Sequence, residues 1–233
     1  MTHFTNPVFV GLDTPDLETA RALATTIKDH VGGLKLGLEF FNAQGPAGLD
    51  AMADIGLPIF ADLKFHDIPN TVAGAIRSIS RTKPAILNIH TAGGPAMMEA
   101  ARKATDEAGP DKPLLIGVTV LTSLDEADMG RVGMRGSPAD QVLRLATLAH
   151  ECGLDGVVCS PLEVEMLRAE LPRDFTLIVP GIRPTWSQTG DQKRIMTPKQ
   201  ALSAGADILV IARPIIKAGD PAQAAQKIAE ELN

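Results

Sequence analysis

Two acids and a lysine stand within six residues of one another, directly after an apolar segment. The acids are Asp62 and Asp67, the lysine is Lys64, and Leu57–Phe60 precede them. If the strand predicted at Leu57–Phe60 continues in extended form, Asp62 and Lys64 point to one face with Cα atoms ~7 Å apart. Charged groups are costly to desolvate, so they are kept together mainly where they are paired and used. The pattern is typical of a catalytic charge set, although a salt-bridged strand end would also produce it.

Further polar residues stand at or just beyond the ends of other predicted strands. Lys35 interrupts the apolar segment Leu34–Leu38, so it must reach solvent at the strand end or meet the acids of the next strand. Asn88 and His90 share a face of another strand, which favours a hydrogen-bonded supporting role over catalysis. Asp13 follows the first strand and could cap the first helix instead of binding a ligand.

Two arginines follow the last two predicted strands and point to the kind of substrate. Arg183 lies in the segment Pro180–Pro184, and Arg213 lies in Ile211–Pro214. In a barrel of alternating strands and helices, the loops after the seventh and eighth strands commonly bind phosphate. A guanidinium group supplies a fixed fork for such an anion. We therefore expect a phosphorylated substrate, with surface arginines as the alternative interpretation.

Short apolar segments alternate with amphipathic ones along the whole chain, which predicts alternating strands and helices. The predicted strands are Val8–Asp13, Leu34–Leu38, Leu57–Phe60 with its continuation, Ala85–Thr91, Leu114–Thr119, Gly156–Cys159, Thr176–Pro180 and Ile208–Ile211. The predicted helices are Asp16–His30, Gly45–Ile55, Asn70–Arg81, Pro95–Ala108, Ala139–Cys152, Leu162–Leu171, Pro198–Ala204 and Pro221–Leu232. Two long loops are expected, Ser123–Ser137 and Gly181–Met196.

This order gives eight strand–helix units without a linker or repeat that would mark a second domain. The sequence therefore predicts the α/β class and a single (β/α)8 TIM barrel over residues 1–233. An open doubly wound sheet is the alternative, but the glycine-rich signature expected after its first strand is missing from Gly11–Pro15. In a barrel the carboxyl ends of all strands meet, which would gather the candidate residues at one end.

The amino-acid composition indicates what kind of core the protein has and which binding partners it is unsuited to. Hydrophobic residues make up 45% of the chain, which is enough for a sizeable core, and aromatic residues only 3%, so that core must be largely aliphatic. The net charge of −6 argues against nucleic acid or an anionic membrane surface as a partner. No apolar run approaches the ~20 residues of a membrane span.

The cysteines and histidines give no sign of a metal site. Cys152 and Cys159 form no metal-ligand pattern, and with no signal-like N-terminal segment they suggest a reduced cytoplasmic protein. The histidines are scattered and each group of acids includes a competing lysine, so neither a metal nor a cofactor is expected.

The motifs closely resemble those of the orotidine 5'-phosphate decarboxylase family. The resemblance runs from the first strand to the last and is most specific in the ten residues Asp62–Thr71; the other matching segments are Val8–Asp13, Lys35–Gly37, Val118–Ser123, Pro180–Pro184, Gly190–Gln192 and Val210–Pro214. It implies a homodimeric barrel enzyme without a cofactor. Such an enzyme converts orotidine 5'-monophosphate to UMP and carbon dioxide in pyrimidine biosynthesis.

The resemblance also implies a role for each matching residue. Lys64 would be the proton donor, with Asp62, Asp67 and Lys35 in its charge network. Asp67 and Thr71 would reach into the active site of the neighbouring subunit. The other substrate-binding residues would be Asp13 and Lys35 at the ribose, Thr122 at the pyrimidine, Gln192 between base and phosphate, Arg183, Ala212 and Arg213 on the phosphate side, and Ile68 beside Asp67. The family usually has glycine where Ala212 stands, so an added methyl group crowds the approach of the backbone to the phosphate.

Two other classes of protein share part of this pattern. A magnesium-dependent sugar-phosphate decarboxylase or aldolase with a barrel fold would share the acids and the lysine but would need a metal. A catalytically silent barrel that binds a phosphorylated ligand would share the arginines, although the intact set of Asp62, Lys64 and Asp67 speaks against it. Activity in the presence of a chelator separates the first class, and a direct assay for UMP separates the second.

Overall fold

Parallel strands closed into a barrel form the centre of the protein. The computed structural model describes residues 4–187 and 196–232. Its strands are β1 (Val8–Gly11), β2 (Gly33–Leu36), β3 (Ile59–Phe65), β4 (Ile86–His90), β5 (Leu114–Val118), β6 (Gly156–Val158), β7 (Thr176–Pro180) and β8 (Ile208–Ile211). Each strand pairs with the next in chain order, and β8 pairs with β1 to close the barrel. The predicted (β/α)8 barrel is confirmed.

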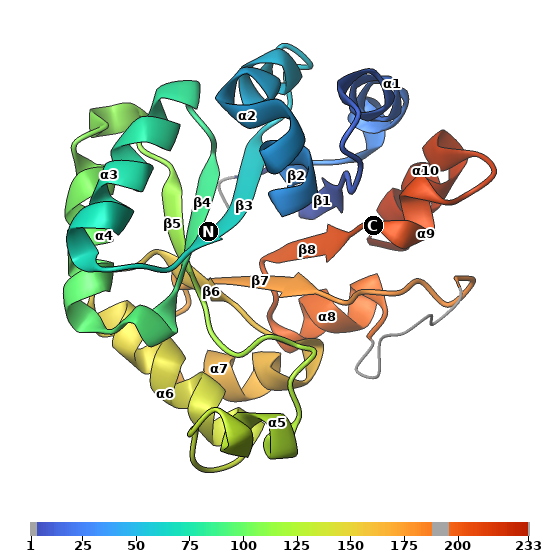
Figure 1. Cartoon of the computed structure of the whole chain (residues 1–233). Helices are drawn as coiled ribbons and strands as arrows, with labels where there is room; N and C mark the ends of the chain where they lie inside the picture. The colour runs from blue at the N-terminus through green and yellow to red at the C-terminus, as the bar shows by residue number, and fades with distance from the viewer. Residues whose placement is uncertain (1–3, 188–195, 233) are drawn as a thin grey trace.

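The helices surround the strands as an outer ring (Figure 1). They are α1 (Leu17–Ile27), α2 (Leu38–Ala53), α3 (Pro69–Ile79), α4 (Pro95–Asp106), α6 (Pro138–Glu151), α7 (Val164–Glu170), α8 (Pro198–Ala204) and α10 (Pro221–Leu232), with the shorter α5 (Glu126–Arg131) and α9 (Arg213–Ile216). Helix α3 begins at Pro69, one residue before the predicted start, and proline suits this position because it lacks the N–H that a first helical residue would leave unpaired.

Two apolar layers hold this arrangement together. The larger layer lies between the strands and the helices, and the smaller one fills the barrel interior with Phe9, Phe60, Ile86, Ile116, Ile178, Ile208 and Val210. Gly33 makes room for the ring of Phe9, because a Cβ atom at Gly33 would lie 2.3 Å from that ring. Strand side chains alternate, so the next inward positions after Phe60 and Ile86 are Asp62 and Asn88. Apolar residues therefore fill the barrel, and polar ones begin toward the carboxyl ends of its strands.

Two regions differ clearly from the predicted elements. The second strand ends at Leu36, and helix α2 begins at Leu38, not at Gly45. Gly45 has φ of 63°, which kinks α2 and hides the continuity of its two halves from the sequence pattern. The predicted loop Ser123–Ser137 contains helix α5, whose N-terminus is capped by the Asp125 side chain.

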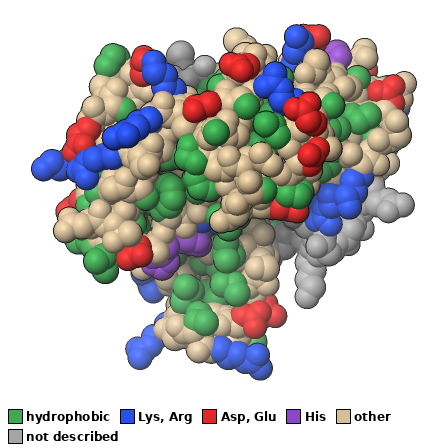
Figure 2. Space-filling model, turned by 45° about the horizontal axis from the view of Figure 1, so that its top comes forward, with side chains coloured by type: hydrophobic (Ala, Val, Ile, Leu, Met, Phe, Trp, Pro, Cys, Tyr) green, Lys and Arg blue, Asp and Glu red, His purple; other side chains and the backbone are tan. Residues whose placement is uncertain are grey.

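Charged side chains of both signs are interspersed over the face of the molecule drawn in Figure 2, with hydrophobic side chains between them. No broad stripe of lysine and arginine crosses that face, in keeping with the net negative charge. In the part of the chain that the structure describes, no helix is long and apolar enough to cross a membrane.

Candidate active site

Strand β3 departs from regular geometry at the residues that carry its charges. Lys64 has φ of 52°, in the left-handed region that side chains other than glycine rarely adopt. The register between β3 and β4 also shifts, from Ala61 opposite Leu87 to Phe65 opposite Ile89. The side chains of Asp62 and Lys64 meet, as the sequence predicts, with 2.5 Å between Lys64 Nζ and Asp62 Oδ1. A bulged strand brings them together instead of the regular one we expected.

Asp62 is the centre of the charged network. Its Oδ1 atom accepts hydrogen bonds from Lys64 Nζ and from Asn88 Nδ2, the latter at 2.7 Å. Its Oδ2 atom lies 3.3 Å from Lys35 Nζ. Burial alone would raise the pKa of this carboxyl group, but Lys35 and Lys64, helped by the two hydrogen bonds, hold its pKa below the usual value. Asp62 therefore stays ionised at neutral pH although it is only 9% exposed.

Lys35 extends the network to the first strand. Its Nζ atom lies 3.5 Å from Asp13 Oδ1 as well as 3.3 Å from Asp62 Oδ2. Charges thus alternate in sign from Asp13 through Lys35 and Asp62 to Lys64, across the ends of β1, β2 and β3. Lys35 meets the acid of the next strand, which is one of the two outcomes that the sequence allows.

Asp67 does not join this network within one chain. In the described residues Lys64 is paired with Asp62, whereas the Asp67 carboxylate accepts a 2.6 Å hydrogen bond from the backbone N–H of Ile68. Asp67 and Thr71 are exposed, and Ile68 is 68% exposed. Within the described part of one chain, the predicted second acid therefore makes no ion pair with Lys64.

A pocket of about 210 Å³ opens beside the charged network. Its charged lining residues are Lys35, Asp62 and Lys64, and Thr122, for which the resemblance implies a contact with the pyrimidine, also lines it. The remaining lining residues are apolar: Phe60, Val118, Val120, Leu121, Val158, Cys159, Ile178, Pro180 and Val210. A pocket with charged residues on one part of its lining and apolar residues on the rest suits a flat ring that bears an ionised group.

The residues predicted on the phosphate side differ in how they are placed. Ala212 precedes α9, and its carbonyl accepts hydrogen bonds from the N–H groups of Ile215 and Ile216, while Arg213 is the first residue of that helix. Arg183 is only 6% exposed, and its Nη1 atom donates to the carbonyl of Ile182. This contact suits a role in fixing the loop after β7. Gln192 lies outside the described residues.

One neighbour of the network was missed by the sequence analysis. The His66 ring lies 5.4 Å from the ring of His90, measured between centroids. Burial, followed by the charges of His66 and Lys64, lowers the pKa of His90. His66 belongs to the same charged segment as Lys64, but nothing in the sequence indicates that it meets a strand 24 residues away. Asn88 has the supporting role that the sequence predicts.

A closed barrel of parallel strands, with an ion-pair network and a pocket at the carboxyl ends of its strands, is the architecture of a (β/α)8-barrel enzyme. The chain belongs to the Orotidine 5'-phosphate decarboxylase / HUMPS family, whose model matches residues 6–228. The family resemblance inferred from the motifs is thereby confirmed.

Relatives that match almost the whole chain agree with this assignment. A protein from Rhodospirillum rubrum named orotidine 5'-phosphate decarboxylase is 54% identical, over 97% of this chain and 94% of its own length. One of the same name from Pasteurella multocida is 48% identical, over 98% of each chain. The crystal structure of orotidine 5'-phosphate decarboxylase from Lactobacillus acidophilus matches with a TM-score of 0.87 at 35% identity, over 98% of this chain and 99% of that one. The chain is a decarboxylase, in the carboxy-lyase class.

Proposed function

We propose that the enzyme converts orotidine 5'-monophosphate to UMP and carbon dioxide, the last step of de novo UMP synthesis, without a cofactor. The observation that carries this proposal is the buried Asp62 carboxylate between two lysines at the edge of the pocket. A divalent cation bound at Asp62 would have to lie against the ammonium groups of Lys35 and Lys64. The arrangement favours chemistry by protein charges over chemistry by a metal.

Lys64 performs the proton transfer in this proposal. When the bond between C6 of the pyrimidine and its carboxylate breaks, the electron pair stays on C6, and no conventional electron sink is at hand. The Lys64 ammonium lies against the Asp62 carboxylate. It stabilises the developing carbanion and then donates a proton to C6. Such a fixed charge is most effective in a pocket that excludes water.

Asp62 and Lys35 prepare the site for this step. Asp62 lies beside the carboxylate of the bound substrate, and the repulsion between the two carboxylates is relieved when carbon dioxide leaves. Lys35 helps to keep Asp62 ionised, and with Asp13 it binds the ribose. Thr122 contacts the pyrimidine. Gln192 bridges base and phosphate, and Ala212 and Arg213, with Arg183 in the adjoining loop, form the phosphate side. Binding energy from the remote phosphate assists the reacting centre.

The active site is shared between two subunits in this proposal. Asp67 and Thr71, with Ile68 between them, enter the pocket of the neighbouring subunit and supply the second acid beside its Lys64. What supports this is that Asp67 is exposed and, among the described residues, makes no ion pair with Lys64 of its own chain, and that Ile68 offers an exposed apolar contact. We place this homodimer in the cytoplasm, since both cysteines are free and buried.

A spectroscopic assay of orotidine 5'-monophosphate decarboxylation, run with and without a chelator, tests the proposal. We expect UMP to form at the same rate in both. Loss of activity in the chelator, restored by magnesium, would favour the metal-dependent class. Binding of the nucleotide without formation of UMP would identify a silent ligand-binding barrel.

A further inference from the structure

We propose that Asn88 is a positioning residue of this site, whose side-chain amide holds the Lys64 backbone in its left-handed conformation and thereby directs the Lys64 ammonium to Asp62. The proposal rests on the function proposed above for its kinetic part and on the structure for its backbone part. Asn88 lies in β4 and is fully buried. It contacts both charged residues of β3.

The backbone of Lys64 needs such support. Two residues other than glycine have positive φ in the described part of the chain, Lys64 at 52° and Lys83 at 48°. Lys83 directly follows a helical turn, where a left-handed residue is a common way to end a helix, and its N–H bonds to the carbonyl of Ser80. Lys64 lies inside a strand, where no such local motif stabilises this conformation. Its stabilisation must come from elsewhere in the fold.

Asn88 is placed opposite the irregular part of β3. Ala61 pairs with Leu87 and Phe65 pairs with Ile89, so β3 has three residues, 62 to 64, where β4 has Asn88 alone. The Asn88 side chain bonds to the backbone at this point, since its Oδ1 atom accepts from the Lys64 N–H at 2.8 Å. A side-chain acceptor thus replaces a backbone partner in the bulged stretch.

The same amide also holds the carboxylate that Lys64 meets. Asn88 Nδ2 donates to Asp62 Oδ1 at 2.7 Å, and Lys64 Nζ donates to that same oxygen at 2.5 Å. Asn88, Lys64 and Asp62 therefore close a ring of three hydrogen bonds. An amide is suited to this place because it offers one acceptor and two donors without adding a charge. Leucine has similar size with neither function, and a carboxylate keeps the acceptor but loses the donor.

Hydrogen exchange and kinetics of three variants test the proposal. Asn88→Leu removes both contacts, Asn88→Asp keeps the acceptor for the Lys64 N–H, and Thr91→Val is the matched control. Thr91 is also fully buried near the end of β4, and its hydroxyl donates to the carbonyl of Val118 rather than to the charged network. We expect the Lys64 amide to exchange slowly in the wild type, Asn88→Asp and Thr91→Val, and much faster in Asn88→Leu.

The kinetic expectation separates positioning from general stability. Asn88→Leu should lower kcat on the order of 10²-fold, because a small displacement of a reacting group has that effect. KM should change little, since the lost contact acts on the reacting step. Asn88→Asp should also lose kcat, because its carboxylate repels Asp62, whereas Thr91→Val should keep the wild-type kcat.

Several outcomes would overturn the proposal. A folded Asn88→Leu protein with wild-type kcat would do so, and so would an equal loss of kcat in Thr91→Val, or a Lys64 amide as protected in Asn88→Leu as in the wild type. If Asn88→Leu does not fold, Asn88→Asp decides, and a wild-type kcat in that variant would count against Asn88. The exchange experiment needs no substrate, so it stands even if the wild type proves unable to decarboxylate orotidine 5'-monophosphate.

Discussion

Two buried aspartates, at opposite ends of the barrel, each lie between two cations. Asp62 stands near the carboxyl end of β3 and is 9% exposed, and Asp207 directly precedes β8 at the other end of the barrel and is 8% exposed. Lys35 and Lys64 flank Asp62, whereas Arg168 and Arg173 flank Asp207. Each site is therefore a carboxylate between two cations, but the cations are lysines in the first site and arginines in the second.

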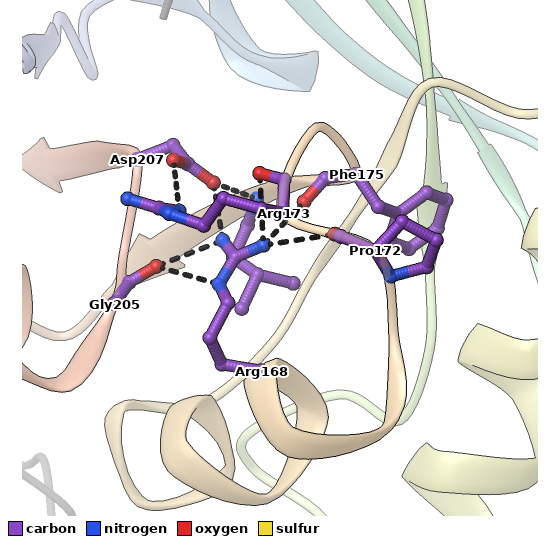
Figure 3. A network of polar contacts seen from close by, with 7 residues as sticks. Arg168, Pro172, Arg173, Phe175, Gly205 and Asp207 are labelled. Carbon is purple, nitrogen blue, oxygen red and sulfur yellow. Dashed lines mark hydrogen bonds and ion pairs between the residues drawn. The ribbon is translucent and has the colours of Figure 1, made fainter. Parts of the chain in front are cut away.

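The arginine site ties backbone segments together (Figure 3). Arg168 lies 2.5 Å from Asp207 and also donates to the carbonyls of Gly205, Pro172, Arg173 and Phe175. Asp207 in turn accepts from the N–H of Leu177, in β7. The donors of this guanidinium, which belongs to α7, are therefore directed at fixed groups in the segment between α7 and β7 and in the segment between α8 and β8.

The same arrangement, an acid paired with a helix arginine, recurs at β5 and β6. Asp155 directly precedes β6, lies 2.8 Å from Arg102 of α4, and accepts from the N–H of Leu115 in β5. Asp155 and Asp207 thus each join a helix to the beginning of two strands. Because this acid–arginine arrangement recurs at the end of the barrel away from the pocket, it indicates a role in stabilising the fold.

The lysine site leaves donors for a ligand. Each ammonium group has three N–H donors, and the described side-chain acceptor of Lys64 is Asp62 alone. An arginine cannot give up its proton at any ordinary pH, whereas a lysine can. In the function proposed above, the two sites thus differ in use: the acid between arginines stabilises the fold, whereas the acid between lysines, beside a pocket, holds the Lys64 ammonium that donates a proton.

The largest effect is expected for Lys64→Ala, which removes the donor that distinguishes the two sites. The rate of UMP formation should fall at least about 10²–10⁴-fold, the usual contribution of a general acid. The protein should stay folded, because Lys64 is partly exposed and Lys35 still faces Asp62. Circular dichroism and the decarboxylation assay measure both. A folded variant that keeps substantial activity would disprove the assignment of Lys64.

Arg168→Ala tests the arginine site around Asp207. Loss of one partner of a buried pair should lower the free energy of unfolding by roughly 3–5 kcal/mol, with kcat of the folded protein unchanged. Arg77→Ala is a matched control, since Arg77 pairs with Glu107 at 2.6 Å on the surface and its loss should change the free energy of unfolding far less. Urea denaturation measures the difference. A fall in kcat without a change in stability would mean that the arginine site is not a scaffold.

Arg213→Ala asks whether an arginine at the pocket end acts as Arg168 does or binds the substrate. If Arg213 binds the phosphate, the variant should bind orotidine 5'-monophosphate more weakly by roughly 2–5 kcal/mol. Orotidine, which lacks the phosphate, should be affected far less. Equal losses for both ligands would show that Arg213 is not the phosphate ligand, and a loss of stability alone would assign it to the scaffold.

The two sites also differ in what the sequence could predict. Lys64 lies on the same strand as Asp62 and Lys35 lies on the neighbouring strand, so the alternation of side chains predicted the first ion pair and strand order allowed the second. The left-handed Lys64 could not be predicted, because it depends on Asn88, which is 24 residues away in the chain. Arg168 looked like an ordinary charge on an amphipathic helix. Its partners come from backbone carbonyls and from Asp207, which leave no pattern in the sequence.

The last difference between the two sites is the number of chains that each needs. The Asp207 site is complete within one chain, whereas Lys64 pairs with Asp62 and, in the described residues of that chain, not with Asp67. If Asp67 serves the neighbouring subunit, an inactive Lys64→Ala protein mixed with an inactive Asp67→Ala protein should regain activity when subunits exchange. In each heterodimer one pocket carries both defects and the other has neither, so about a quarter of all sites should be intact at random equal mixing. Heterodimers that stay as inactive as both parents would show that Asp67 acts in its own subunit, because then every pocket would keep one of the two defects.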